Sequence, residues 1–221
     1  MSTYPSSRKT YDALINAAGQ LAAEYGFSNV STRAIAERAG ENIGSIHYHF
    51  GNKERLFEQV VMEATRLKRE HPVSDILESY KDSLNSPKVQ GKVLRGIVHT
   101  YISIIFHPSS PKWHKRVIYQ AMQFHSSLRD LLMKEVGEPD IKAVAGFIKK
   151  IKPDLPDEYA FLHTFIIQAP IVFHSNFTEP ILNQLGREEF SADYLQRMED
   201  IIVEQTQWFL GLPLDKGIQG E

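Results

Sequence analysis

The chain has 221 residues, of which 42% are hydrophobic, and this is long enough for one large domain or two modest domains with buried cores. It contains no cysteine, which excludes a disulfide scaffold and thiolate metal sites, and no apolar run approaches the length that spans a bilayer. The formal net charge of -2 gives no global sign of nucleic-acid binding, so any basic binding surface has to be local.

The first element in chain order is a predicted helix over residues 8–25. Gly26 follows it as a helix-stopping glycine. Ser31 is placed to cap a second helix over residues 32–39, and Gly40 supplies the positive φ that a tight turn between helices requires. The apolar positions of the first helix recur every three or four residues, at Tyr11, Leu14, Ile15, Ala18, Leu21, Ala22 and Tyr25.

A third, very short helix is predicted over residues 43–49 with Asn42 as its cap, and a fourth begins after Gly51 and Asn52. Two short helices that are separated by a glycine turn and flanked by two longer helices are typical of a helix-turn-helix unit. In such a unit the N-terminal end of the second short helix enters the major groove of DNA.

The third helix is expected to have one apolar edge and two polar ones. Ile46 and Phe50, four residues apart, face the core of the small unit. Gly44 and Ser45 are small, so the start of the helix can approach phosphates and base edges. Lys53 lies at the amino end of the fourth helix, where a phosphate would also meet free backbone N–H groups.

Three sequence blocks lie between Ala13 and Phe57: an alanine-rich first helix that ends in "YGF", then "STRAIAERAG", and then "SIHYHFGNKERLF". With these blocks at this spacing, the sequence resembles the TetR family of transcriptional regulators. It departs from the family at His47, where most members have tyrosine. Two segments, "ENIGSIHYHFG" and "LHTFIIQAP", further resemble the CecR-like branch of the family.

The resemblance implies DNA-contact roles for ten residues. Thr32 and Arg33 are expected to touch the DNA backbone from the start of the second helix. Tyr48, His49 and Lys53 are expected to bind phosphates. The residues expected to face the major groove are Asn42, Ile43, Gly44, Ser45 and His47.

Several of these side chains also have a purely structural interpretation. Tyr48 could pack against the first helix, and Arg33 and Lys53 could be ordinary solvated charges. His47 and His49 could be surface histidines; they are two residues apart and so lie on different faces of a helix, which argues against zinc binding by this pair alone. We predict no metal site and no cofactor.

Beyond residue 72 the sequence predicts only further helices, so the expected fold class is all-α. An N-terminal helix-turn-helix DNA-binding domain would span residues 1–54, and a larger helical ligand-binding and dimerisation domain would span residues 55–221. A helix over residues 53–69 would connect the two domains. The later helices are expected near residues 73–80, 89–106, 112–134, 139–151, 157–177 and 192–212.

Aromatic side chains of the middle helices provide the material for an apolar cavity, and four histidines could serve as its polar groups. Core packing explains many of these side chains equally well. For a TetR-like protein this implies a small-molecule effector of unknown identity. The predicted lining is Tyr101, Trp113, Tyr119, Phe124, Phe165 and Phe173, and the four histidines are His99, His125, His163 and His174.

Two helices near the C-terminus are apolar on more than one side, which suggests burial against a second copy of the chain. The predicted interface residues are Phe173, Ile201, Ile202 and Trp208. Members of the TetR family dimerise through their last two long helices, so the resemblance implies the same homodimer. A symmetric dimer suits a palindromic operator in double-stranded DNA, with half-sites about 34 to 36 Å apart. The alternative is that these helices are internal to a monomer.

Catalytic motifs are absent from the sequence: it has no G-x-S-x-G, no glycine-rich phosphate loop, no H-E-x-x-H and no cysteine nucleophile. We therefore expect a non-enzymatic DNA-binding regulator, which in this family is most often a repressor. The alternative is a helical adaptor that binds a protein partner without sequence-specific DNA binding. Residues 1–25 lack the apolar core of a signal peptide, so the expected location is the cytoplasm, with no membrane partner.

Overall fold

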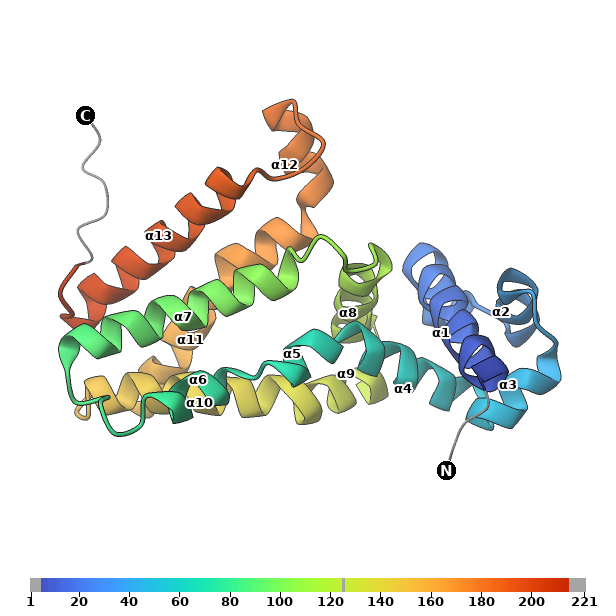
Figure 1. Ribbon diagram of the computed structural model, residues 1–221, viewed down its shortest axis with the longest axis horizontal. Helices are drawn as coiled ribbons and strands as arrows, with labels where there is room; N and C mark the ends of the chain where they lie inside the picture. The colour runs from blue at the N-terminus through green and yellow to red at the C-terminus, as the bar shows by residue number, and fades with distance from the viewer. Residues whose placement is uncertain (1–4, 125, 215–221) are drawn as a thin grey trace. The chain divides into compact units, whose positions relative to one another are not determined.

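The computed structural model describes residues 5–124 and 126–214, and every regular element in these two ranges is helical (Figure 1). The predicted all-α fold is therefore confirmed. The described residues form two compact units. One contains the chain up to Arg69 together with Ser109–Val136, and the other contains Glu70–Pro108 and the chain from Gly137 onwards. Within the described ranges, no helix is both long and apolar enough to cross a membrane.

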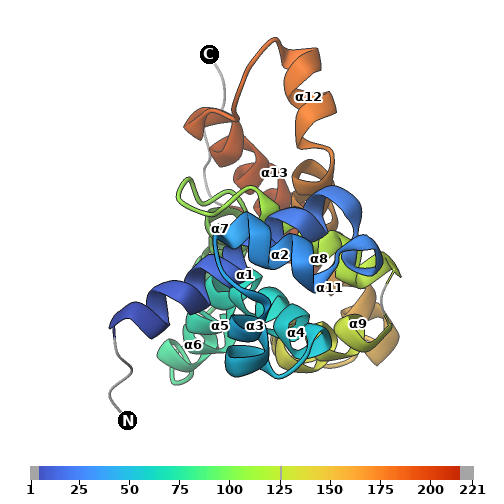
Figure 2. The ribbon, with the colours of Figure 1, turned by 90° about the vertical axis from the view of Figure 1, so that its right-hand side faces the viewer.

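The first unit contains the predicted helix-turn-helix elements and two helices from later in the chain. Figure 2 looks onto its α2 and α3 side. A short 3-10 turn, Phe27–Asn29, links α1 to α2. The helices of the unit are α1 (Pro5–Tyr25), α2 (Thr32–Ala39), α3 (Ile43–Phe50), α4 (Lys53–Ala64), α8 (Trp113–Phe124) and α9 (Ser126–Leu132).

The helix ends of this unit follow the local signals of the sequence. Gly26 has φ 82 and Gly40 has φ 69, a region that glycine enters without steric cost. The hydroxyl oxygen of Ser31 accepts a hydrogen bond from the backbone N–H of Ala34 at 3.1 Å, and so caps α2. These three predictions are confirmed.

The fourth helix is shorter than predicted. It was expected to continue to about residue 69, but α4 ends at Ala64 and a separate short helix, α5 (Arg66–Glu70), follows. The interruption lies at Thr65, whose hydroxyl donates to the carbonyl oxygen of Val61 at 3.0 Å. The backbone N–H of Thr65 donates to the same carbonyl oxygen at 3.1 Å, and a side-chain hydroxyl that shares this acceptor slightly destabilises and bends a helix.

The compact units do not divide at the expected boundary after residue 54. Leu56, Phe57 and Val60 of α4 are buried in the same core cluster as Val117 and Ala121 of α8. α8 therefore belongs to the first unit by its packing, although more than forty residues separate it from α4 in the chain. This pairing depends on contacts between distant segments, which helical periodicity alone does not indicate.

Trp113 is the anchor of α8 on α1. Its indole N–H donates to the side-chain oxygen of Asn16 at 2.8 Å, and a Cβ added at Gly19 would lie 2.5 Å from the Trp113 ring. Further along, the side-chain amide of Gln120 donates to the carbonyl oxygen of Ala23 at 3.3 Å. Gly19 thus leaves the space that the indole ring fills.

We expect Gly19→Ala to destabilise the protein by about 1 to 3 kcal/mol, because the new methyl group overpacks the Trp113 site. Gly146→Ala is the matched control: Gly146 also lies inside a helix, and a Cβ there meets nothing within 4 Å. The control should be neutral or gain up to about 1 kcal/mol from helix propensity. Urea unfolding of both variants measures the difference, and equal stability would show that Trp113 does not depend on Gly19.

The second unit is a bundle of long helices joined by shorter ones. The expected helices are present, with one addition: residues 178–185 form α12, which the sequence analysis missed. The helices of this unit are α6 (Val73–Ser79), α7 (Pro87–Ile105), α10 (Glu138–Ile151), α11 (Asp157–Asn176), α12 (Thr178–Leu185) and α13 (Ala192–Leu210).

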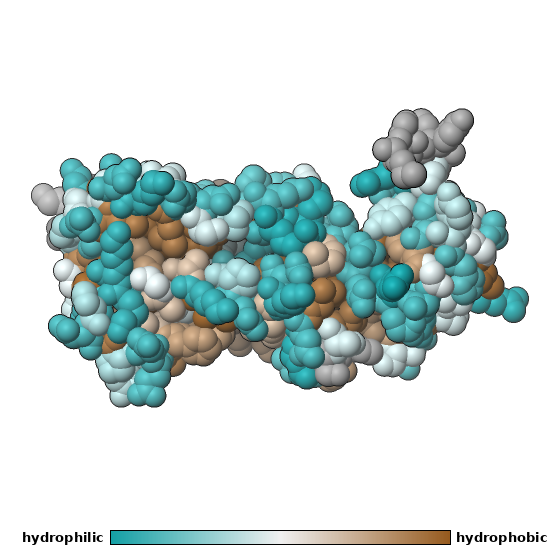
Figure 3. All heavy atoms as spheres, turned by 90° about the horizontal axis from the view of Figure 1, so that it is seen from below, coloured by the Kyte–Doolittle hydropathy of each residue, from teal (hydrophilic) through white to brown (hydrophobic). Residues whose placement is uncertain are grey.

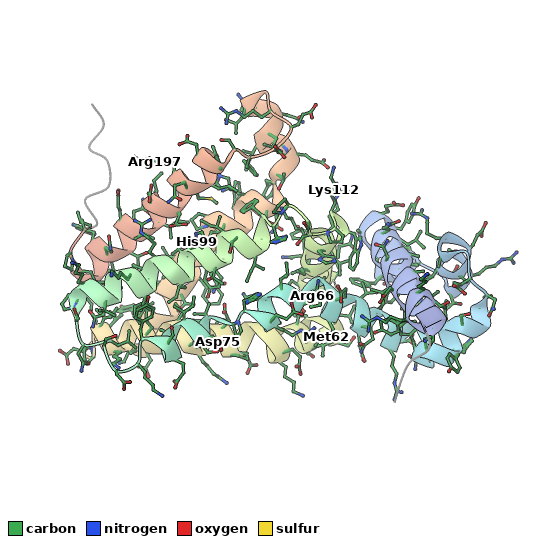
Figure 4. The ribbon with its side chains drawn as sticks, viewed as in Figure 1. Met62, Arg66, Asp75, His99, Lys112 and Arg197 are labelled. Atoms are coloured by element: carbon green, nitrogen blue, oxygen red, sulfur yellow. The ribbon has the colours of Figure 1, made fainter. Side chains whose placement is uncertain are left out.

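The core of the second unit is mostly aliphatic, with Tyr101 and Phe147 among its buried side chains, and a group of charged residues joins two of its helices. α7 and α13 run side by side, with His99 on α7 and Arg197 on α13 labelled in Figure 4. The guanidinium of Arg95 lies 3.0 Å from the carboxylate of Glu199 and 2.7 Å from that of Asp200. His99 Nδ1 lies 2.8 Å from the other oxygen of Glu199. These contacts fix the position of α13 along α7.

Candidate nucleic-acid interface

The recognition helix predicted from the sequence, α3, has one buried edge and one exposed edge. Ile46 and Phe50 are buried, and the ring of Phe50 packs against Tyr11 of α1 with 4.9 Å between ring centroids. On the other side, Gly44, His47 and Tyr48 are exposed. Their spacing of three and four residues places them on one helical face. This exposed stripe is the part of α3 that a major groove could receive.

The N-terminus of α3 is closed by a side-chain cap. The side-chain oxygen of Asn42 accepts from the backbone N–H of Ser45 at 2.9 Å. A Cβ at Gly44 would lie 2.9 Å from that same oxygen, so glycine is the residue that lets the cap form. Ile43, the first residue of the helix, is exposed. The predicted cap is confirmed. Asn42 accordingly has a structural role besides its predicted place at the groove.

The hydroxyl of Ser45 makes a hydrogen bond within the protein. It donates to the carboxylate of Glu41 at 3.4 Å, and Thr10 of α1 donates to the other oxygen of Glu41 at 2.8 Å. Glu41 thus ties the start of α3 to α1. The sequence analysis missed this residue, because its partner Thr10 lies thirty-one positions away and no local pattern connects the two.

His47 and Tyr48 differ from His49 in their surroundings. The side chain of Tyr48 is 80% exposed, so the interpretation that it packs against the first helix is wrong. It is His49 that turns toward α1: it is half-buried, and its ring centroid lies 6.0 Å from that of Tyr11. His47 is exposed, and its Nδ1 lies 3.0 Å from the carbonyl oxygen of Gly51.

The residues expected to touch the DNA backbone lie at two helix starts. Thr32 and Arg33 occupy the first turn of α2, with Thr32 half-buried and Arg33 exposed. Lys53 begins α4, where its ammonium group donates to the carbonyl oxygen of Val30 at 3.1 Å and lies 5.9 Å from the ring centroid of Phe57. Lys53 is therefore not merely a solvated charge, since it holds the start of α4 to the segment before α2.

The six aromatic residues predicted to line a ligand cavity are divided between the two compact units. Trp113, Tyr119 and Phe124 belong to the first unit, where Trp113 is part of the core and the other two are exposed. These three residues lie on α8, which packs with α1 and α4, so they do not belong with the second unit to which the sequence analysis assigned them. Tyr101, Phe165 and Phe173 belong to the second unit, as expected. One of the candidate histidines, His125, lies outside the described residues.

Tyr101 belongs to a polar group inside the second unit. Its hydroxyl donates to the carboxylate of Asp140 at 2.7 Å. The side-chain amide of Gln168 donates to the Tyr101 oxygen at 3.1 Å and to Asp140 at 3.2 Å. Burial and the neighbouring Asp140 carboxylate raise the pKa of the Tyr101 hydroxyl above its ordinary value, so it stays a donor at neutral pH. Three helices, α7, α10 and α11, contribute to this group.

Hydrophobic side chains reach the surface over a broad area of the second unit, shown in brown in Figure 3. α11 is apolar around most of its circumference. It buries Ile167 and Ile171, while one run of its apolar side chains is exposed: Tyr159, Phe161, Leu162, Phe165, Ile166, Val172 and Phe173. A surface of this composition is typical of a face that another protein covers.

Of the predicted interface residues on α13, Ile201 is 42% exposed and Trp208 is 79% exposed. Ile202 is only 4% exposed, because it packs into the core of its own unit with Val203 and Met198. The assignment of Ile202 to the dimer interface is therefore wrong. Ile201 and Trp208, seven residues apart, lie on the same face of the helix, whereas Ile202 faces inward.

Residues 14–60 match the family model of the bacterial regulatory proteins, tetR family. This segment covers α2 and α3 together with the second half of α1 and the first part of α4, so it contains the capped α3 and its exposed stripe. A comparison of the whole chain with curated proteins gave no match.

Solved structures of similar fold cover nearly the whole chain. NalD of Pseudomonas aeruginosa, the secondary repressor of the MexAB-OprM multidrug efflux pump, has a TM-score of 0.59 at 21% identity, over 96% of this chain and 100% of its own. AibR in complex with isovaleryl coenzyme A and operator DNA has a TM-score of 0.63 at 14% identity, over 89% and 97%. The flavonoid-responsive regulator FrrA has a TM-score of 0.57 at 24% identity, over 91% and 96%. Residues 14–60 thus resemble the tetR family of bacterial regulatory proteins, and the chain as a whole has the fold of these solved regulators.

Proposed function

We propose that two copies of this chain form a transcriptional regulator that binds a palindromic operator through α3 and loses or gains DNA affinity when a small molecule binds the second unit. The observation that carries the proposal is the architecture of α3. A short helix, capped by Asn42 and held to the core by Ile46 and Phe50, presents the stripe of Gly44, His47 and Tyr48 to its surroundings. A helix with this exposure suits insertion into the major groove.

The effector part of the proposal is supported by the second unit and by one structural neighbour. AibR was solved with both isovaleryl coenzyme A and operator DNA, so this fold accommodates a small molecule and DNA in one protein. In the present chain, the group of Tyr101, Asp140 and Gln168 places polar atoms among aliphatic side chains. Polar groups of this kind fix the orientation of a ligand in an otherwise apolar site.

The segments "ENIGSIHYHFG" and "LHTFIIQAP" support placement in the CecR-like branch, which a phylogeny of full-length homologues would test.

Selection from random double-stranded DNA tests the DNA-binding part directly. We expect the purified full-length chain to enrich one sequence with inverted repeats, and to bind it far more tightly than scrambled DNA at physiological salt. If the chain enriches no sequence and its binding disappears as salt is raised, the protein is not a sequence-specific regulator. The adaptor function would then be the better account.

Lys53 offers a test of the phosphate contacts. We expect Lys53→Gln to weaken binding to all DNA sequences alike and to reduce the slope of log K against log salt by about one for each chain bound, because one phosphate contact per chain is lost. Fluorescence anisotropy over a salt series measures this slope. Lys150→Gln, an exposed change on α10 of the second unit, is the control and should leave it unchanged. An unchanged slope for Lys53→Gln, in a variant that still folds, would limit Lys53 to its contact with Val30.

A further inference from the structure

The side chain of His47 is held in one orientation by the end of its own helix. Its Nδ1 lies 3.0 Å from the carbonyl oxygen of Gly51, and the backbone N–H of Gly51 donates to the carbonyl oxygen of His47, also at 3.0 Å. Gly51 has φ 80, which glycine adopts without steric cost. The ring of His47 is therefore held by one hydrogen bond to Gly51, whose own backbone is tied to His47 by the second, before any DNA is bound.

The bond to Gly51 also determines which nitrogen of the ring carries the proton. A carbonyl oxygen can only accept a hydrogen bond, so Nδ1 has to be the donor. In the neutral imidazole the other nitrogen, Nε2, then has a lone pair and accepts hydrogen bonds. Because His47 is exposed on the same face as Gly44 and Tyr48, this acceptor lies on the stripe proposed to enter the groove.

We propose that His47 determines operator specificity as a hydrogen-bond acceptor, by receiving a hydrogen bond at Nε2 from the exocyclic amino group of adenine or cytosine. The proposal rests on the proposed function of α3. In the major groove only adenine N6 and cytosine N4 carry donors, whereas guanine and thymine present acceptors. His47 thus favours adenine or cytosine at one position of each half-site. A tyrosine at this position would not impose that choice, because its hydroxyl both donates and accepts.

The first step of the test identifies the base that His47 contacts. Wild type, His47→Ala and His47→Phe are each subjected to selection from random DNA. We expect both variants to lose the preference at one position of each half-site, where the wild type selects adenine or cytosine, and to keep the remaining preferences. Circular dichroism confirms that the variants are folded, and His47→Phe keeps an aromatic ring while it removes both nitrogens.

The second step removes single functional groups from that base. Operators are synthesised with purine in place of adenine, or 2-pyrimidinone in place of cytosine, so that only the amino group is lost. We expect the wild type to bind the altered operator about three- to tenfold more weakly for each half-site changed, as for one lost hydrogen bond. His47→Ala should bind both operators equally, which separates the effect on His47 from the effect on base pairing.

The outcomes distinguish failure of this inference from failure of the proposed function. If the wild type selects guanine at the position and is weakened by 7-deazaguanine there, Nε2 donates and the inference is wrong. If the variants keep every preference of the wild type, His47 does not contact a base, although the chain remains a sequence-specific regulator. If the wild type selects no sequence at all, the proposed function fails and this inference fails with it.

The tautomer can be measured separately in the free protein. We expect long-range ¹H–¹⁵N correlation spectra of ¹⁵N-labelled protein, assigned by comparison with His47→Phe, to show Nδ1 protonated and Nε2 unprotonated in the neutral form of the ring. A spectrum with the proton on Nε2 would overturn the inference, since the contact with Gly51 would then not set the ring.

Discussion

Ile201→Glu is expected to convert the protein into a folded monomer with little operator affinity. Ile201 is exposed on the face of α13 that also carries Trp208, and the proposed dimer buries this face. A carboxylate buried there without a partner costs several kcal/mol. Because the interface is two-fold symmetric, each dimer would contain two such carboxylates. Loss of the second half-site contact should lower operator affinity by about 100-fold or more. Sedimentation velocity measures the dimer, and anisotropy measures DNA binding.

Two matched variants make the outcome of this experiment specific. Ile202→Glu, at the adjacent position, should unfold the second unit, because Ile202 is buried in the core of its own chain. Lys150→Glu, an exposed change on α10, should leave a folded dimer. If Ile201→Glu remains a dimer with full operator affinity, the exposed face of α13 is not the interface. An equivalent change at Trp208 would be expected to repeat the result of Ile201→Glu.

Arg95→Met is expected to destabilise the protein by about 3 kcal/mol or more. The side chain of Glu199 is only 5% exposed, and the guanidinium of Arg95 at 3.0 Å is its cationic partner on α7. Methionine fills similar space but removes the positive charge. The buried Glu199 carboxylate then loses its partner Arg95 and keeps only its contact with His99. Removal of one partner from a buried ion pair costs about 3 to 5 kcal/mol.

Urea unfolding followed by circular dichroism measures this loss. Lys142→Met is the control, because Lys142 and Glu138 form an ion pair at 3.5 Å on the exposed side of α10. Pairs of that kind contribute about 0.5 kcal/mol or less. The double variant Arg95→Met with Glu199→Gln should recover part of the loss, since the buried charge of Glu199 is then removed and only the more exposed Asp200 has lost its partner. A loss for Arg95→Met as small as that of the control would show that the α7 and α13 contact is solvated.

Local signals in the sequence predicted most of the DNA-binding elements. Gly26, Ser31, Gly40 and Asn42 each act within four residues of their own position, through positive φ or a side-chain cap, so a single sequence is enough to place them. The exposed position of His47 follows from the same logic, because Ile46 next to it fills the core.

The parts that could not be predicted depend on contacts between distant segments. Nothing near Trp113 indicates that it fits against Gly19, ninety-four positions earlier, and so α8 was assigned to the wrong unit. On α13 the apolar stripe is broad, and the sequence alone does not show that Ile202 faces its own core while Ile201 faces outward. The link from Thr10 to Glu41 was missed for the same reason. Each of these requires knowledge of which helix lies opposite.

The most direct test of the central claim is the stoichiometry of the complex on the selected operator. Analytical ultracentrifugation of the full-length chain with the selected duplex should show two chains on a sequence with two inverted half-sites. Scrambling one half-site should lower the affinity by about 100-fold, because only one of the two copies can then make specific contacts through its α3. A complex of one chain with one duplex, with equal affinity for intact and half-scrambled DNA, would contradict the account of a dimer that recognises a palindrome.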